Sequence, residues 1–255
     1  MSEQILLKEK KGNIFFITLN RPDNFNALSN ALMDELHAAL SAFRDDAGLH
    51  VAIVTGTGKN FCSGADIKQF GDKEAQTPEA IAKRANTSME VHLLFAQIAK
   101  PIIVSARGYA LAGGCGIAMA GDIVVASENA VFGYPEVKRG FVPALVLVNL
   151  SKLVGRRCAL EMLMFGEKVP AQKALEYGMV NYVVPDEKLE GKTLELAETL
   201  ASYSPDALSS IKKQYYDALD MSLEDGLKRA REGNIAMRQS KEFAAGVKNF
   251  KEGGK

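Results

Sequence analysis

The stretch YALAGGCGIAMAGD, residues 109 to 122, opens a predicted apolar helix with glycines and offers almost no side chain capable of chemistry. The first turn of a helix has backbone N–H groups without internal partners, and the helix dipole adds partial positive charge there. Glycines let a ligand approach these groups closely. The stretch therefore predicts an anion site, for a phosphate or for the oxyanion of a carbonyl under attack. Close packing of the helix on a strand is the alternative explanation.

A second stretch, FCSGADIKQF at residues 61 to 70, also follows a predicted strand and a turn. Two such loops can each donate one backbone N–H to the same oxygen. That arrangement is an oxyanion hole, in which each donor contributes roughly 2.7 to 4 kcal/mol to the transition state. The pair of loops therefore favours chemistry at a carbonyl.

A third stretch, FGYPEVKRG at residues 132 to 140, supplies a carboxyl group. Glu136 follows a proline and lies among aromatic residues and Val137. Apolar surroundings raise the pKa of a carboxyl towards neutrality, where it can both take and give a proton. A glutamate in a loop is ordinarily solvated, but these neighbours favour catalysis.

Nucleotide and nucleophile motifs do not fit. In VTGTGKNF the first glycine of a phosphate-binding loop is replaced by Ile53, and Asn60 stands where serine or threonine is required. Phe61 replaces the third glycine of GxGxxG, and no GxSxG occurs. Cys115 at a helix start remains an alternative nucleophile, but no histidine is near it in sequence.

The elements that must position these stretches alternate strand and helix as far as about residue 187, after which the patterns are helical and charged. This order predicts an α/β fold, with a core at residues 1–190 and a helical region at 191–255. Strands are predicted at 5–7, 14–19, 51–55, 102–106, 122–126 and 181–184. Helices are predicted after Ser29, from Thr77 towards Lys100, as a short apolar run that follows the glycines at 113, 114 and 116, and at 145–154, 156–165 and 170–177, with 145–154 and 156–165 expected to be buried.

Composition limits the partners. Lys plus Arg and Asp plus Glu both number 31 among 255 residues, so no charge excess attracts nucleic acid or an anionic membrane. No apolar run reaches membrane-spanning length, and MSEQILLKEKK lacks the core of a signal peptide. The three cysteines are unsuited to a disulfide framework, and no ligand cluster implies a metal or redox cofactor. We expect a cytoplasmic protein.

Taken together, the three stretches resemble the enoyl-CoA hydratase/isomerase family, or crotonase superfamily. The resemblance covers nearly the whole chain, and the order and spacing of its pieces make it specific. It implies a crotonase-like core of β-β-α turns forming a spiral, and a C-terminal helical region that joins subunits into trimers or dimers of trimers. The pieces are LNRPDNFNALS, FCSGADI, KPIIVSARGYALAGGC, GDIVVAS, FGYPEVKRGFVP, AQKALEYGMVNYVVP and EFAAGVKNFKEGGK.

The resemblance also implies an acyl-CoA thioester substrate, whose coenzyme A needs no separate cofactor. The amides of Ala65 and Gly113 would hold the thioester oxygen, and Glu136 would act as acid and base. Residues expected along the coenzyme A and acyl path are Asn26, Ala27, Leu28, Asp66, Ile67, Lys68, Gly114 and Tyr134, with Phe250 and Lys251 closing the adenine pocket of a neighbouring subunit.

Two departures from the family pattern affect the expected reaction. Gly116 stands where the best-known hydratases carry their first glutamate, and residues 140–155 are continuously apolar where many members are glycine-rich, which suggests an altered acyl pocket wall. Asp66, Asp122 and Tyr134 are candidates for a second polar group, although Asp122 is expected to cap a strand turn. The hypotheses are, in order, a 2-enoyl-CoA hydratase, a double-bond isomerase with one glutamate, a non-catalytic acyl-CoA-binding subunit, and a thioester hydrolase.

Overall fold

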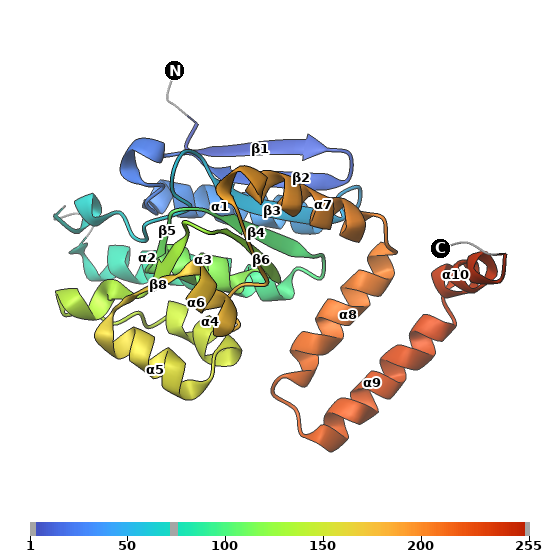
Figure 1. Ribbon diagram of the computed structural model, residues 1–255. Coiled ribbons are helices and arrows are strands. Elements are labelled where there is room, and N and C mark those ends of the chain that lie inside the picture. Colours follow the sequence, from blue (N-terminus) through green and yellow to red (C-terminus); the bar gives the residue numbers. More distant parts are fainter. Residues whose placement is uncertain (1–3, 72–75, 253–255) are drawn as a thin grey trace.

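A six-stranded sheet forms the centre of the computed structural model, which describes residues 4–71 and 76–252 (Figure 1). Its strand order is β1-β2-β3-β4-β6-β9, with the hairpin β1–β2 antiparallel and the other pairs parallel. The expected hairpin and strands are confirmed. The bounds are β1 Leu6–Lys11, β2 Ile14–Leu19, β3 Val51–Gly56, β4 Ile102–Ala106, β6 Ile123–Ser127 and β9 Tyr182–Val184.

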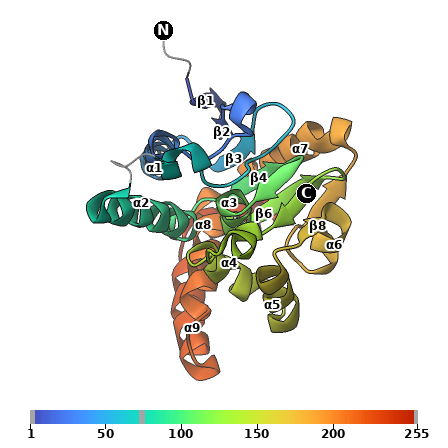
Figure 2. The same cartoon turned by 90° about the vertical axis from the view of Figure 1, so that its left-hand side faces the viewer.

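The two faces of this sheet contact different helices. Alternation along β3 sends Ala52 and Val54 into the main core, with α1, α2 and α3, and sends Val51 and Ile53 into a smaller core under α7. Figure 2 shows α1 and α2 on one side of the sheet and α7 on the other. The bounds are α1 Asn30–Asp45, α2 Pro78–Gln97, α3 Gly113–Ala120 and α7 Leu189–Ala201.

A second, smaller sheet continues the spiral towards the expected site. It has the order β5-β7-β8, comprising Tyr109–Leu111, Val131–Gly133 and Lys168–Pro170, and these strands were not expected from the sequence. Isolated bridges pair Cys62 with Ala110 and Leu28 with Ala65. The loops after β3 and β5 therefore lie side by side, where the three stretches that carry chemistry can meet.

The C-terminal helices extend away from the sheet. Figure 1 shows α8 (Pro205–Ala218), α9 (Leu223–Arg238) and α10 (Lys241–Lys251) as a projecting arm. The expected boundary at residue 190 falls inside α7, and α7 itself packs on the sheet. Ser204 and Ser222 cap α8 and α9 by accepting backbone hydrogen bonds from Ala207 and Asp225.

Two expected helices are less buried than predicted. Helices α4 (Val146–Leu153) and α5 (Arg156–Phe165) form, but each buries only two side chains. Met164 and Phe165 are about two-thirds exposed in this chain, at 66% and 64%. The expectation that both helices are buried is therefore wrong for the single chain, because apolar sequence alone does not say whether its cover comes from the same subunit. The remaining helix is α6 (Ala171–Glu176), and 3₁₀ turns include Ile67–Gly71 and Pro135–Arg139.

Candidate active site

Two loops bring the backbone amides of Ala65 and Gly113 together. A Cβ atom placed on Gly113 would lie 3.9 Å from the Ala65 nitrogen, and one placed on Gly64 would lie 3.3 Å from the Gly113 nitrogen. Hydrogen bonds from Leu28 N to Gly64 O, 2.8 Å, and from Asp66 N to Leu28 O, 3.1 Å, hold the first loop. The structure thus places the two predicted donor residues beside each other.

Both amides are free to donate. Gly113 is the first residue of α3, where no intrahelical acceptor exists for its N–H. Within residues 4–71 and 76–252, neither the Gly113 nor the Ala65 amide has a hydrogen-bond acceptor. Ala112, just before the helix, has a φ of 51°, which alanine rarely adopts. This turn aims the helix start at the Ala65 loop.

Backbone crowding explains the glycines around the donors. Gly64 has a φ of +96°, and a Cβ there would lie 2.6 Å from the Cβ of Ala112. Gly114 packs against Cys62, whose carbonyl oxygen would lie 2.3 Å from a Cβ at 114. Close packing, the alternative weighed from the sequence, accounts for Gly114. Gly113 differs, because the one tight contact of its Cβ would be with the flexible Cδ1 of Leu28, at 3.1 Å.

Glu136 lies on the 3₁₀ turn that follows β7. The end of β7 is joined to the glycine entrance by a hydrogen bond from Ala112 N to Gly133 O, 2.8 Å. The Glu136 Oε2 atom is buried and has no hydrogen-bond partner among the described residues. Burial raises the pKa of this carboxyl, while its own backbone amide and Arg139 oppose the rise. The direction of this shift agrees with the rise expected from apolar neighbours, and the role of Glu136 in proton transfer stays a prediction.

Tyr134 and Cys115 lie close to Glu136. Tyr134 is fully buried, and its hydroxyl is unpartnered within the described part of the chain. Burial and the neighbouring Cys115 thiol raise the pKa of Tyr134 well above its ordinary value. Burial likewise raises the pKa of Cys115 to about 12. Because the thiol stays protonated at neutral pH, the alternative of Cys115 as a nucleophile loses its physical basis.

The position of the missing glutamate is closed. A Cβ on Gly116 would lie 2.2 Å from Cγ1 of Val146 and 3.1 Å from Cε1 of His92. Val146 is on α4, inside the apolar segment that was expected to alter the pocket wall, and His92 is on α2. These two side chains occupy the space that any side chain at 116 would enter.

The predicted residues of the first loop serve largely to hold it. Asn26 is fully buried, and its amide donates to Thr57 O and Asn60 O at 2.9 and 2.7 Å. Its Oδ1 accepts from Arg21 N at 2.8 Å. Asp66 pairs with Arg21 at 2.8 Å. Both side chains are thus engaged within the protein.

Arg21 is a residue that the sequence reasoning missed. Besides Asp66, its guanidinium donates to the backbone oxygen of Ala27, so it ties the two segments on either side of the Leu28–Ala65 bridge. Arg21 lies in the NRPDN part of the motif that carries the family resemblance, and its partners come from two segments that meet only in the folded chain.

The remaining predicted path residues differ in exposure. Ala27 is buried, Leu28 is half-buried, and Ile67 is 65% exposed. Lys68 is exposed, and its Nζ donates to Asn24 Oδ1 at 2.9 Å. Phe250 belongs to α10, but its side chain lies outside the described residues; its role at the adenine stays a prediction.

Asp122 has a structural role. Its carboxylate accepts a hydrogen bond from Ile102 N at 2.7 Å and pairs with Lys212 of α8 at 2.6 Å. Asp122 thus caps the start of β4, as expected, and fastens the C-terminal arm to the sheet. Since Asp66 is paired with Arg21, Tyr134 is the one of the three candidates for a second polar group that has a buried, unpartnered polar atom within the described part of the chain.

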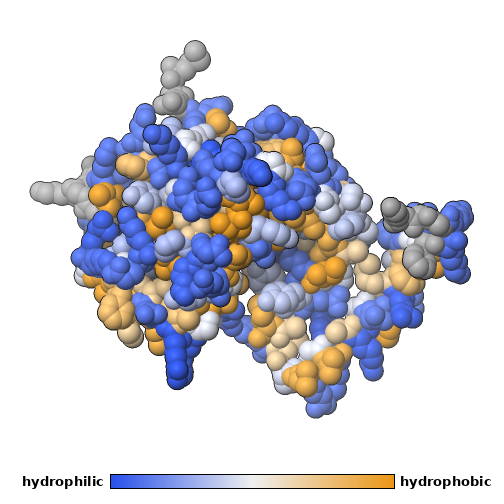
Figure 3. Space-filling model, viewed as in Figure 1, coloured by the Kyte–Doolittle hydropathy of each residue, from blue (hydrophilic) through white to orange (hydrophobic). Residues whose placement is uncertain are grey.

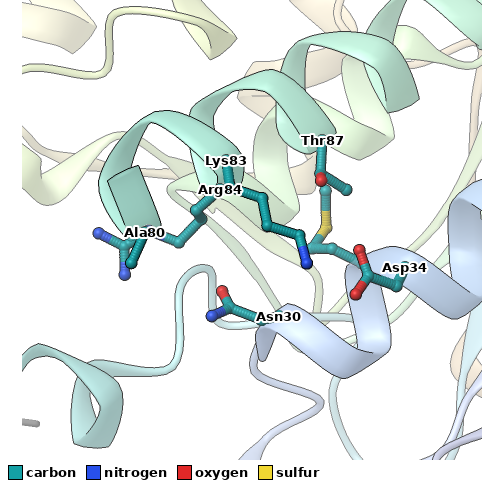
Figure 4. Close-up of a pocket in the computed structure, with 7 residues that line it drawn as sticks. Asn30, Asp34, Ala80, Lys83, Arg84 and Thr87 are labelled. Atoms are coloured by element: carbon teal, nitrogen blue, oxygen red, sulfur yellow. The ribbon is translucent and has the colours of Figure 1, made fainter. Parts of the chain in front are cut away.

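A groove between α1 and α2 lies apart from these residues. It is lined by side chains of both helices, and neither Ala65, Gly113 nor Glu136 borders it (Figure 4). In the described ranges no helix is long and apolar enough to cross a bilayer, and no group of three or more His, Cys, Asp or Glu residues could hold a metal. The groove residues are Asn30, Met33, Asp34, Ala80, Lys83, Arg84 and Thr87.

Comparison with known proteins accords with this geometry. The sequence model of enoyl-CoA hydratase/isomerase matches residues 9–255. The chain is 37% identical to the probable mitochondrial enoyl-CoA hydratase of Dictyostelium discoideum, over 86% of this chain and 78% of that protein. It is 33% identical to the 2,3-dehydroadipyl-CoA hydratase of Escherichia coli, over 98% and 96%.

Solved structures agree on the fold. An enoyl-CoA hydratase of Mycobacterium smegmatis superposes with a TM-score of 0.95 at 28% identity, covering 99% of this chain and 98% of that one. Human enoyl Coenzyme A hydratase domain-containing protein 3 gives 0.94 at 29% identity, covering 99% of each. The expected crotonase-like α/β fold is confirmed.

Proposed function

The chain belongs to the enoyl-CoA hydratase/isomerase family, and from this premise we propose that it adds water to a 2-enoyl-CoA thioester. The observation that carries the proposal is the pair of adjacent free amides, Ala65 and Gly113, together with a glutamate, Glu136, that follows the strand end bonded to Ala112 and has a buried, unpartnered Oε2 atom. Hydratase names among the relatives support hydration over other reactions of the family.

The two amides would act on the thioester oxygen. When water attacks C3, the C2=C3 electrons move towards C1 and negative charge develops on that oxygen. Two fixed N–H donors, with the dipole of α3 behind Gly113, stabilise the resulting enolate more than the neutral thioester. The amides are already aimed and unpaired, so they need no rearrangement as the charge forms.

Glu136 would then move the proton. Its carboxylate takes a proton from water as the oxygen–C3 bond forms, and the carboxylic acid returns a proton to C2 as the enolate collapses to the thioester. The sum is one water added and the carboxylate regenerated, so one carboxyl and the oxyanion hole account for the whole step. A raised pKa suits both roles near neutral pH. In the proposed step the proton transfer and the charge stabilisation are both supplied by this chain, so it uses no metal or redox cofactor, and coenzyme A is part of the substrate.

The coenzyme A portion would run along the first loop. Leu28 flanks Gly113, and exposed Ile67 and Lys68 follow Ala65, so together they would border the pantetheine and the nucleotide. Phe250 and Lys251 sit on α10, which Figure 1 places far from α2 and α3 of the same chain. Their contact with the adenine would come from a neighbouring subunit.

A double-bond isomerase is the second candidate, favoured by the closed position at Gly116. Moving a double bond needs one carboxyl that removes a proton and returns it elsewhere, and Glu136 alone could do so. A turnover panel of 2-enoyl- and 3-enoyl-CoA esters followed by mass spectrometry separates the two reactions. Hydration adds the mass of water, whereas isomerisation leaves the mass unchanged. We expect the 2-enoyl esters to gain water; failure of every 2-enoyl ester to do so would overturn the hydratase assignment.

We also propose a homotrimer or a dimer of trimers, with residues 191–255 as the joining region. The arm exposes apolar side chains, among them Leu223 at 81% and Ile211 at 65%, and Figure 3 shows apolar patches over α8 and α9. Light scattering after size exclusion should give three or six times 27.6 kDa; a stable monomer at micromolar concentration would contradict it. Three free cysteines favour a reducing, cytoplasmic setting.

A further inference from the structure

The two predicted oxyanion donors are held in different ways. Gly113 is the first residue of α3, so the helix and the hydrogen bond from Ala112 N to Gly133 O fix the direction of its amide. Ala65 lies between β3 and the 3₁₀ turn Ile67–Gly71, outside both elements. The direction of the Ala65 amide therefore depends on contacts with another segment of the chain.

That segment is the one that ends at Leu28. Leu28 N donates to Gly64 O at 2.8 Å, and Leu28 O accepts from Asp66 N at 3.1 Å. This parallel bridge engages the backbone on both sides of Ala65, whose own amide has no acceptor within the described ranges. The Leu28 side chain also borders the second donor, because its Cδ1 would lie 3.1 Å from a Cβ on Gly113. The position of Leu28 therefore affects both donors.

Arg21 fastens the two sides of this bridge to each other. Its guanidinium donates to Ala27 O and, at 2.8 Å, to Asp66 Oδ2. These two acceptors directly adjoin Leu28 and Ala65, so one planar group spans both segments of the bridge. The side chains of Arg21 and Asp66 are only 17% and 8% exposed, so solvent screens this ion pair little.

The ion pair also removes an unfavourable charge. Asp66 directly follows Ala65, so an unpaired carboxylate there would oppose the negative charge expected on an oxygen bound to the Ala65 amide. Its Oδ1 accepts from Lys68 N at 3.2 Å, and its Oδ2 is taken by Arg21. The arginine is itself held in place, because its backbone N donates to Asn26 Oδ1 at 2.8 Å and its backbone O accepts from Asn26 N at 2.9 Å.

We propose that Arg21 is a positioning residue of the reaction: it aims the Ala65 amide at the thioester oxygen and neutralises the carboxylate beside that amide. The inference rests on the proposed oxyanion hole, but not on whether Glu136 hydrates a double bond or moves it. Loss of the guanidinium should weaken stabilisation of the enolate more than binding of the neutral ester, because the amides interact most strongly with the developed charge.

Kinetics and binding together test this difference. In Arg21→Met, kcat on the ester class that the wild type turns over should fall about 10²-fold, while the Kd for hexanoyl-CoA measured by calorimetry should stay within about threefold. Arg21→Lys keeps the charge without the planar fork, so it should recover part of kcat. Arg107→Met is the matched control, because Arg107 also pairs with two carboxylates, Asp186 and Glu190, and it should keep kcat.

Infrared spectroscopy of bound hexanoyl-CoA, labelled with carbon-13 at the thioester carbonyl, reads the two donors directly. Hydrogen bonds to the oxygen lower the C=O stretching frequency, so the wild type and Arg107→Met should show a lower frequency than the free ester. In Arg21→Met the frequency should return most of the way to the free value. This readout separates a positioning role from a general loss of stability.

A wild-type frequency in Arg21→Met, or an equal loss of kcat in Arg21→Met and Arg107→Met, would overturn the proposal and leave the proposed function standing. If Arg21→Met does not fold, Arg21→Lys decides, and a wild-type frequency and kcat in that variant would likewise overturn the proposal. A bound ester whose frequency is not lowered in the wild type would overturn the proposed oxyanion hole as well.

Discussion

The two flanks of α3 differ in whether their buried polar groups have hydrogen-bond partners. On the flank of Cys115, the hydroxyl of Tyr134 and one carboxylate oxygen of Glu136 are buried without partners among the described residues. On the flank of Gly116, Val146 fills the space, and Nδ1 of His92 is paired with Asn149. Unpaired buried polar atoms reduce stability, so they persist where a ligand or a reaction uses them. The difference supports the proposal that proton transfer takes place on the Glu136 flank.

The largest effect is expected from Glu136→Gln. Removing the acid and base should lower kcat on a 2-enoyl-CoA about 10²- to 10⁴-fold. Because burial raises the pKa of Glu136 in the folded state, its carboxylate reduces stability above the unfolded pKa, and this cost is relieved as pH falls. The neutral glutamine should therefore not lower Tm at pH 7. Glu128→Gln, at an exposed glutamate, is the control; equal kcat in both variants would remove Glu136 from the mechanism.

The pH dependence of kcat/KM in the wild type also tests the role of Glu136. As pH falls through the raised pKa of Glu136, the carboxylate that accepts the proton of water is lost. The acid limb of kcat/KM should consequently lie at a higher pH than an ordinary glutamate would give. A profile measured with a stable buffer series that is flat down to the range of solvated carboxyls would contradict the assignment.

Alanine at Gly113 should separate function from folding. The added methyl would lie 3.9 Å from the Ala65 nitrogen, and its one tight contact would be the flexible Cδ1 of Leu28 at 3.1 Å. We expect kcat/KM to fall about 10²-fold with little change in Tm. Gly114→Ala should instead act on folding: it should lower the free energy of unfolding by about 1 to 3 kcal/mol, because its Cβ would meet the carbonyl oxygen of Cys62. Thermal unfolding and steady-state kinetics, measured on both variants, distinguish the two effects. Equal losses of Tm in Gly113→Ala and Gly114→Ala would contradict the prediction.

The closed flank is tested by a double-mutant cycle. Gly116→Ala should destabilise the protein by about 1 to 3 kcal/mol, since its Cβ would lie 2.2 Å from Val146 Cγ1. Combining it with Val146→Ala should recover part of that loss, giving a coupling of about 1 to 2 kcal/mol in urea unfolding. Strictly additive effects would show that the two positions do not share the space.

The smallest effect concerns His92 and pH. Its folded pKa of about 4 lies below the ordinary 6.5, so the stability its neutral form contributes is present above pH 6.5 and is lost as pH falls towards 4. Between pH 6.5 and 5 the free energy of unfolding of the wild type should drop by about 1.5 kcal/mol relative to His92→Phe. If the free energy of unfolding changed with pH equally in the two proteins, the imidazole would be solvated rather than buried.

The sequence indicates the candidate site residues better than it indicates the residues and strands that hold them in place. Ala65, Gly113 and Glu136 stand in local motifs whose order follows the chain, and the longer strands of the main sheet, such as β3 and β4, show as short apolar runs. Gly116 was recognised as a departure, but the side chains that fill its space come from α2 and α4, 24 and 30 residues away. Such contacts depend on tertiary packing, which no local pattern encodes. For the same reason Arg21 was missed, and the strands β5, β7 and β8, three residues each, were too short to show alternation.

The central claim is that the amides of residues 65 and 113 hold the thioester oxygen while Glu136 faces the acyl carbons. A crystal structure with hexanoyl-CoA, which cannot be hydrated, tests it most directly. We predict both amide nitrogens at about 2.7 to 3.1 Å from that oxygen, with the Glu136 carboxylate beside C2 and C3. A thioester bound elsewhere, or a carboxylate turned away from the acyl chain, would contradict the account.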